Sequence, residues 1–249
     1  MDSSKVTRSR IVVLASGTAK GGGSGFRELV EYSSTVPAVL DADIVGVASN
    51  HANGGVRKYA DALGIEFVHL PTPVTAEAYW ALVKYFNADY VMCSGWILPV
   101  SGLKPEQTLN IHPGLLPEFG GQGMWGHHVH EAAMSAYHRG ETAQTGVAMH
   151  FVTDYEKQRA AGVKDPYDKG PIICWFPVKI RPDDTPETLA VHVNEKERFV
   201  QSRVLNLVVH HEICLHGDHV GYTAKARMIL LGMGGVIPNG CSRFEIPAK

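Results

Sequence analysis

Asn110 and His112 stand two residues apart at the end of an apolar stretch, at the head of the segment NIHPGLLPEFGGQGMWG, residues 110–126. Residues two apart share a face of an extended strand, so this amide and this imidazole point the same way. Two donors that converge on one oxygen atom can stabilise a developing oxyanion. The spacing fits equally well an Asn that caps a turn beside a half-buried His, and both interpretations stand at this point.

The residues around this pair favour an irregular segment that follows a buried strand. Leu109 to Ile111 can end such a strand, and Pro113 and Pro117 prevent a helix from starting early. The glycines beyond them let backbone come close to a ligand. The sequence therefore predicts a ligand-facing loop directly after the strand.

Strand-like and helix-like patterns alternate along most of the chain. Strands are expected at 11–15, 44–49, 66–70, 90–93, 109–111, 144–152 and 171–180, and helices at 26–34, 55–63, 75–86, 124–137 and 185–216. This alternation predicts an α/β fold whose doubly wound, mainly parallel sheet is covered on both faces. Such sheets bind ligands at the carboxyl ends of their strands.

A glycine-rich loop, SGTAKGGGSG, connects the first strand to the first helix. Its glycines permit close backbone approach, and the amides that begin the next helix can receive an anion such as a phosphate. The loop lacks the GK[ST] ending of a Walker motif and a clean GxGxxG spacing. A phosphate site and a ligand-free turn both fit it. The loop and the Asn110 segment are both expected at strand ends, which strengthens the binding interpretation of each.

Composition limits the class of protein. The chain has 249 residues, 45% hydrophobic and 19% charged, which suits one domain with a core of about 10–216 and a C-terminal extension of about 217–249. The net charge is −2 and the only basic run is Lys5 to Arg10, so no nucleic-acid partner is expected. The segment MDSSKVTRSR resembles neither a secretory signal nor a membrane span, so we expect a cytoplasmic protein without a membrane partner. Nothing in the sequence points to a particular oligomeric state.

Several residue types that can carry chemistry receive a structural interpretation. The four cysteines lack CxxC spacing, so neither disulfides nor a thiolate zinc site is expected. The histidines between 127 and 138 have no Asp or Cys partner at a recognised ligand spacing, so we expect no metal. Trp80 and His150 are expected in the core. The polar stretch 153–169 is expected to be a long loop, and such loops are often functional or mobile.

The segments NIHPGLLPEFGGQGMWG, HFVTD and DKGPII together resemble the folate-dependent formyltransferases, from the first strand to about Val208. Among them the branch that acts on glycinamide ribonucleotide is the most similar. The resemblance implies a Rossmann-like fold and transfer of a formyl group from 10-formyltetrahydrofolate to a small-molecule amine. It assigns the catalytic roles to Asn110, His112 and Asp168.

The implied chemistry begins when the amine attacks the formyl carbon, which leaves a negative oxygen on a tetrahedral centre. Asn110 and a protonated His112 would each donate a hydrogen bond to that oxygen. Asp168 would hold the imidazole oriented and charged, and would help to move the amine proton to the leaving nitrogen.

The resemblance also assigns substrate contacts. The nucleotide phosphate would lie on Gly23, Ser24 and Gly25, although this loop is several residues longer than usual and Gly25 stands where the family usually has Asn. Glu197 would contact the nucleotide. The folate would lie near Ile97, Leu98 and Val100, where the family often has a basic residue close to position 98. The insertion 156–167 lengthens the loop that carries Asp168, and it is a candidate lid.

Other functions remain as alternatives. The acceptor can be another amine, such as an amino-sugar nucleotide. A formyltetrahydrofolate deformylase uses the same donor but usually carries an amino-terminal regulatory domain, whereas about ten residues precede the first strand here. A methionyl-tRNA formyltransferase is disfavoured by the GMWG segment and by the lack of a basic tail. A nucleotide-binding module without turnover would not need a trio that handles protons.

Overall fold

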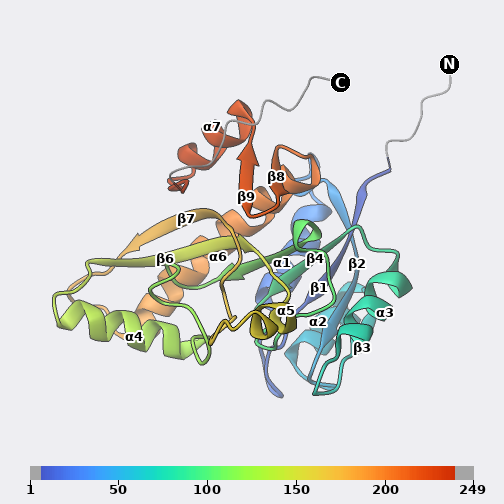
Figure 1. Ribbon diagram of the computed structural model, residues 1–249, viewed down its shortest axis with the longest axis horizontal. Coiled ribbons are helices and arrows are strands. Elements are labelled where there is room, and N and C mark those ends of the chain that lie inside the picture. The colour runs from blue at the N-terminus through green and yellow to red at the C-terminus, as the bar shows by residue number, and fades with distance from the viewer. Residues whose placement is uncertain (1–6, 239–249) are drawn as a thin grey trace.

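A computed structural model describes residues 7–238, and its centre is a seven-stranded sheet in the order β3-β2-β1-β4-β5-β6-β7 (Figure 1). The strands are β1 (Ser9–Leu14), β2 (Ala42–Ser49), β3 (Phe67–His69), β4 (Tyr90–Ser94), β5 (Thr108–His112), β6 (Gln144–Phe151) and β7 (Ile172–Lys179). The first five are parallel, and β6 pairs antiparallel with both β5 and β7. The predicted mainly parallel α/β fold is therefore confirmed.

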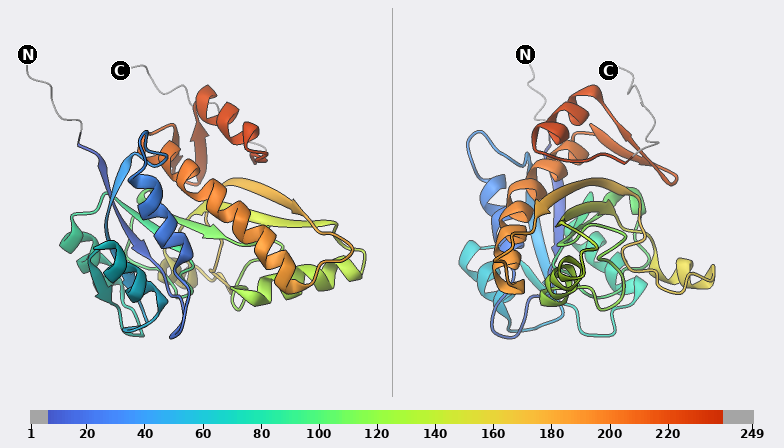
Figure 2. Two further views of the ribbon diagram at one scale, coloured as in Figure 1. Left: turned by 180° about the vertical axis from the view of Figure 1, so that it is seen from behind. Right: turned by 90° about the vertical axis from the view of Figure 1, so that its left-hand side faces the viewer.

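Helices cover both faces of this sheet. One face carries α1 (Ser24–Ser33), α2 (Gly55–Leu63) and α6 (Pro186–Val209), and the other carries α3 (Ala76–Phe86). Figure 2 shows α1 and α6 side by side along their face. Strand β1 supplies both cores, because Ile11 and Val13 join one buried cluster and Val12 and Leu14 join the other. A strand buried on both faces explains the continuous apolar run in its sequence.

The strand order changes direction at the centre of the sheet. Strand β1 lies between β2 and β4, and β5 follows β4, so the carboxyl ends of β1, β4 and β5 are neighbours. In doubly wound folds the crevice beyond such a switch point is where ligands bind. The glycine-rich loop follows β1 and the Asn110 segment includes the end of β5, so the topology brings the two together. Helix α4 (His127–His138) follows the second of them.

The C-terminal part differs from the expectation. Helix α6 ends at Val209, and the chain then forms a hairpin of β8 (Ile213–His216) and β9 (His219–Tyr222), followed by α7 (Ala224–Gly232). His211 has a left-handed φ of 56°, which directs the chain away from the helix axis. Val220, Tyr222, Ala226 and Leu230 are buried in the same cluster as the rest of the core. Residues 239–249 of the expected extension, including Cys241, lie outside the described residues.

Two local expectations also need correction. Trp80 is 58% exposed, since the buried stripe of α3 runs through Tyr79, Leu82 and Phe86 and leaves position 80 facing outwards, where its ring lies 5.1 Å from Lys84 Nζ. The stretch 153–169 is not wholly a loop, because it contains the short helix α5 (Tyr155–Ala160), whose first turn Asp154 caps. Within residues 7–238 no helix is both long and apolar enough to cross a membrane.

Candidate active site

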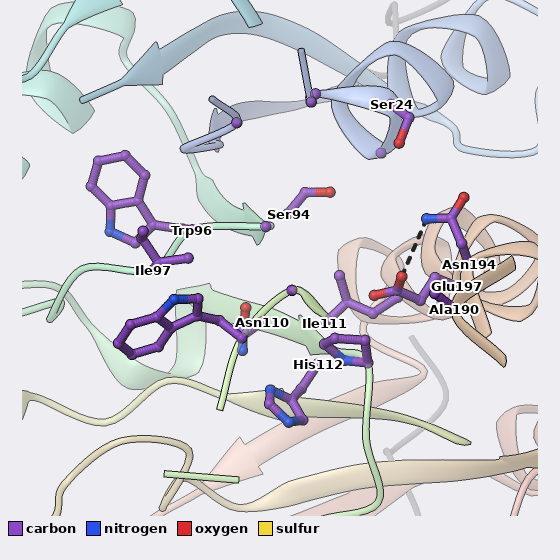
Figure 3. A pocket seen from close by; sticks show the side chains of 18 of the residues that line it. Ser24, Ser94, Trp96, Ile97, Asn110, Ile111, His112, Ala190, Asn194 and Glu197 are labelled. Atoms are coloured by element: carbon purple, nitrogen blue, oxygen red, sulfur yellow. Dashed lines mark hydrogen bonds between the residues drawn. The ribbon is translucent and has the colours of Figure 1, made fainter. Parts of the chain in front are cut away.

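A cavity of about 1100 Å³ opens beyond the carboxyl ends of β1, β4 and β5. Figure 3 shows Ser24 of α1, Glu197 of α6, and Asn110 and His112 of β5 arranged around this space. Most of the residues singled out in the sequence line it: Gly23, Ser24, Gly25, Ile97, Asn110, His112, Asp168 and Glu197. The fold thus brings together groups that are as far apart as 170 positions in the chain.

Asn110 is held in one orientation by His150 on the neighbouring strand β6. Its Nδ2 atom lies 3.0 Å from His150 Nε2, and His150 Nδ1 lies 2.9 Å from the Phe151 carbonyl oxygen. A carbonyl only accepts, so in the neutral ring Nδ1 carries the proton and Nε2 accepts from Asn110. The second N–H of the amide is left for a ligand. His150 is 2% exposed, as expected of a core residue, and it also orients Asn110.

His112 is 4% exposed, and both of its ring nitrogens face protein oxygens. Nε2 donates to the Phe119 carbonyl over 2.6 Å, and Nδ1 lies 3.7 Å from Asp168 Oδ2. Burial lowers the pKa of His112 and outweighs the Asp168 carboxylate, which raises it. The direction of this shift runs against a charged ring, and the role expected for Asp168 in keeping His112 charged stays a prediction. In the neutral form of the imidazole, the lone pair of Nδ1 points towards Asp168.

Asp168 contacts both imidazoles. Its Oδ1 atom lies 3.5 Å from His150 Nε2, and its Oδ2 atom accepts from the backbone N–H of Gly121 over 3.1 Å. Burial raises the pKa of Asp168, but a hydrogen bond from His150 and the positive charges of His112 and His150, in the protonated forms of these rings, lower it together with the Gly121 N–H to about 2. Asp168 is therefore a fixed negative charge beside His112.

A second carboxylate joins the loop that carries Asp168 to the segment after β5. Asp165 Oδ2 accepts from the backbone N–H of Gln122 over 2.9 Å. The insertion itself rests on the segment after β4, because the Glu156 N–H donates to Ser101 Oγ over 3.2 Å. The inserted segment 156–167 thus bridges two loops beside the cavity, and its role as a lid stays a prediction.

The glycine-rich loop ends in a helix start with free amides. Gly23 caps α1 with a φ of 90°, a left-handed conformation that favours glycine, and no side chain caps the helix. Its first amides, at Ser24 and Gly25, are at the cavity wall and can receive an anion.

The absence of a side chain at Gly25 has a steric cause. A Cβ atom there would lie 2.2 Å from Ser94 Oγ. Ser94 Oγ donates to Gln201 Oε1 over 2.8 Å, and Gln201 Nε2 donates to the Gly25 carbonyl over 3.2 Å. The Ser94–Gln201 pair therefore occupies the space that an Asn at position 25 would need.

Helix α6 presents a polar stripe to the cavity. Asn194, Glu197 and Gln201 are three and four residues apart, which places them on one face. Burial raises the pKa of Glu197 to about 7, although the hydrogen bond that Asn194 Nδ2 donates over 3.4 Å acts to lower it. The sequence analysis found only Glu197, although the helical spacing of these polar residues was a usable signal. It also missed Glu28, His130 and Arg198, which line the same cavity.

The three residues expected to contact folate do not lie in one cavity. Ile97 lines the main cavity. Leu98 lines a second hollow of about 600 Å³ beside Thr72 and Glu156, and Val100 is buried at 8% exposure in the hydrophobic cluster beneath α3. Two tryptophans, Trp96 and Trp125, also line the main cavity.

Two of the histidines of α4 lie beside glutamates. His127 Nε2 lies 3.4 Å from Glu187 and 3.6 Å from Glu131, and His128 Nδ1 lies 3.0 Å from Glu131. Across residues 7–238 no three or more His, Cys, Asp or Glu side chains are grouped so that they could hold a metal ion.

Comparison with known proteins gives a consistent result. Residues 9–205 match the family model described as "Formyl transferase". The chain is 29% identical over 211 residues to the chloroplastic phosphoribosylglycinamide formyltransferase of Arabidopsis thaliana, covering 80% of this chain and 66% of that one. It thus spans just under two thirds of the length of that relative.

Solved structures show the same fold. Phosphoribosylglycinamide formyltransferase from Coxiella burnetii matches with a TM-score of 0.67 at 26% identity, over 86% of this chain and 92% of that one. A formyltetrahydrofolate deformylase from Pseudomonas syringae matches with a TM-score of 0.66 at 23% identity, over 86% of this chain and 66% of that one. Because the family model matches well over half of its length, the chain belongs to the formyl transferase family.

Proposed function

We propose that this protein transfers the formyl group of 10-formyltetrahydrofolate to the primary amine of glycinamide ribonucleotide, a step of purine biosynthesis. The proposal rests above all on the wall formed by Asn110, His112 and Asp168, where an amide donor, a neutral imidazole and a carboxylate face one cavity. The name of the Arabidopsis relative favours the same acceptor.

The geometry gives each residue a part in the reaction. The amine nitrogen bonds to the formyl carbon, and the free N–H of Asn110 donates to the oxygen as it becomes negative. That negative charge, added to Asp168, raises the proton affinity of His112, so that Nδ1 takes the proton that the amine loses by way of Asp168, and the charged ring stabilises the oxyanion. The tetrahedral centre then collapses, the bond to the folate nitrogen breaks, and that nitrogen receives the proton.

The substrates would enter from different parts of the cavity. The free amides of Ser24 and Gly25 suit the nucleotide phosphate, and Glu197 suits its hydroxyl or amine groups. The folate would lie near Ile97, Leu98 and Val100, on the side of Asn110 away from Glu197. No metal takes part in this proposal.

The proposal is tested by following the absorbance of a 10-formyl folate donor with glycinamide ribonucleotide present, absent, or replaced by an amino-sugar nucleotide. Turnover only with glycinamide ribonucleotide is the expected result. Donor consumption without any amine would instead indicate the deformylase, the function named for the Pseudomonas syringae structure. Preference for the sugar would identify another acceptor, and no consumption would indicate a binding module. A cytoplasmic location stays a prediction from the sequence.

A further inference from the structure

The mechanism above leaves one buried histidine of the cavity without a role. His130, on the first turn of α4, is 6% exposed and lines the cavity. Its Nδ1 atom is enclosed and has no hydrogen-bond partner among residues 7–238. A buried polar group usually has a partner, because leaving it unpaired costs free energy. Within the part of the chain that the structure describes, Nδ1 of His130 lacks one.

Packing alone does not explain this residue. Its inward-facing neighbours on α4 are Val129, Ala133 and Met134, all buried and apolar. An apolar side chain at position 130 would fill the same space without burying an unpaired nitrogen. The neighbouring His128 is different, since it is exposed and pairs with Glu131. The ring also lines the cavity, so a ligand bound there can meet a polar ring nitrogen that an apolar side chain would not offer.

The surroundings of His130 indicate an uncharged ligand group. Burial, and then the charges of His127 and His112, lower the pKa of His130 to about 4. The ring is neutral at neutral pH and offers one N–H and one lone pair. Enclosure of Nδ1 favours the tautomer with its proton on Nε2. A neutral imidazole suits a hydroxyl or amide oxygen, whereas a phosphate beside it would favour the charged form.

The position of α4 decides which substrate His130 meets. Helix α4 packs against α6, and His127 contacts Glu187 at the start of α6. Figure 3 shows Glu197 and Asn194 of α6 on one side of Asn110 and His112, with Ile97 and Trp96 on the other. His130 therefore belongs to the α6 side, which is the side assigned to the acceptor.

We infer that His130 is a specificity-determining residue that donates a hydrogen bond to an uncharged hydroxyl or amide oxygen of the acceptor and so places the amine beside His112. The inference rests on the proposed formyl transfer and adds a contact to it.

Steady-state kinetics of three variants test this role. In His130→Leu, the KM for glycinamide ribonucleotide should rise about tenfold, the effect of losing one hydrogen bond, while the KM for the formyl donor stays unchanged. His130→Gln keeps a neutral N–H and should recover most of the affinity. His128→Leu, a matched change on the exposed side of the same helix, should behave as the wild type.

The outcomes separate the two claims. A wild-type enzyme that formylates no amine contradicts the proposed function and this inference together. An active His130→Leu with an unchanged KM for the acceptor, or with a raised KM for the donor instead, overturns the inference alone. A second measurement needs no variant: adding glycinamide ribonucleotide to protein labelled with ¹⁵N-histidine should shift the ring-nitrogen signals of His130, and unchanged signals would overturn the inference as well.

Discussion

The Asn110 side chain faces the cavity in one orientation because His150 accepts a hydrogen bond from its amide nitrogen. This contact leaves a fixed N–H where an oxyanion would form. His112 is arranged differently, since burial lowers its pKa beside Asp168, and in the proposed mechanism it gains a proton only when more negative charge arrives. At the scale of single residues, the proposed mechanism therefore combines a hydrogen-bond donor that is already oriented, Asn110, with a ring that becomes protonated during the reaction, His112.

Replacing His112 by Ala should lower turnover by about a hundredfold to a thousandfold, because one stabilising group of the transition state is lost. The protein should stay folded, which circular dichroism and thermal unfolding would check. His138→Ala, on the exposed end of α4, is the control and should leave turnover unchanged. Near-normal turnover of His112→Ala would show that this ring is not catalytic.

Replacing Asp168 by Asn should lower the pKa of His112 further. The carboxylate is the main group that raises this pKa, so without it burial acts nearly unopposed and the ring stays neutral down to lower pH. Titration of the His112 ring signals by NMR would measure the shift, and turnover should fall in parallel. A pKa of His112 that is unchanged or higher in Asp168→Asn would contradict the assigned contact.

At the scale of elements, β4, α1 and α6 meet at the end of the glycine-rich loop through Ser94, Gly25 and Gln201. The junction joins residues 107 and 176 positions apart in the chain. It fixes where the first amides of α1 point, and it uses a glycine where a side chain would collide.

Gly25→Ala and Ser94→Ala should show strong coupling in a double-mutant cycle. Gly25→Ala forces the new Cβ against Ser94 Oγ, whereas in Ser94→Ala the nearest atoms left are Gln201 Oε1 at 3.4 Å and the Cβ of residue 94 at 3.6 Å. We expect Gly25→Ala to lower the free energy of unfolding by about 1–3 kcal/mol less in the Ser94→Ala protein than in the wild type. Urea unfolding of the four proteins measures this coupling, and additive effects would mean that the collision does not occur.

At the scale of the whole molecule, the C-terminal hairpin and α7 close the sheet at β7. Tyr222 donates its hydroxyl hydrogen to the Ile173 carbonyl over 2.6 Å, and Trp175 and Val236 exchange two backbone hydrogen bonds of 3.0 and 2.7 Å. The segment therefore covers an edge strand that would otherwise expose unpaired backbone groups.

Deleting residues 217–249 should destabilise the protein and promote aggregation. The deletion removes several buried side chains, each worth about 1.5–3 kcal/mol, and it uncovers the edge of β7. Thermal unfolding and size-exclusion chromatography would show both effects. Met228→Ala, on α7 but 70% exposed, is the control and should change neither. Equal melting temperatures for the deleted and full-length chains would show that the segment is not part of the core.

The sequence by itself determined the features that depend on local patterns. Apolar runs between short helices predicted the α/β sheet, and a spacing of two placed Asn110 and His112 on one face, because side-chain direction in a strand is set by the local backbone. Resemblance added Asp168. Only the tertiary structure decided the protonation of His112, the orientation of Asn110, the collision at Gly25 and the unpaired ring of His130. Each of these depends on burial and on distances between residues far apart in the chain, which packing alone fixes.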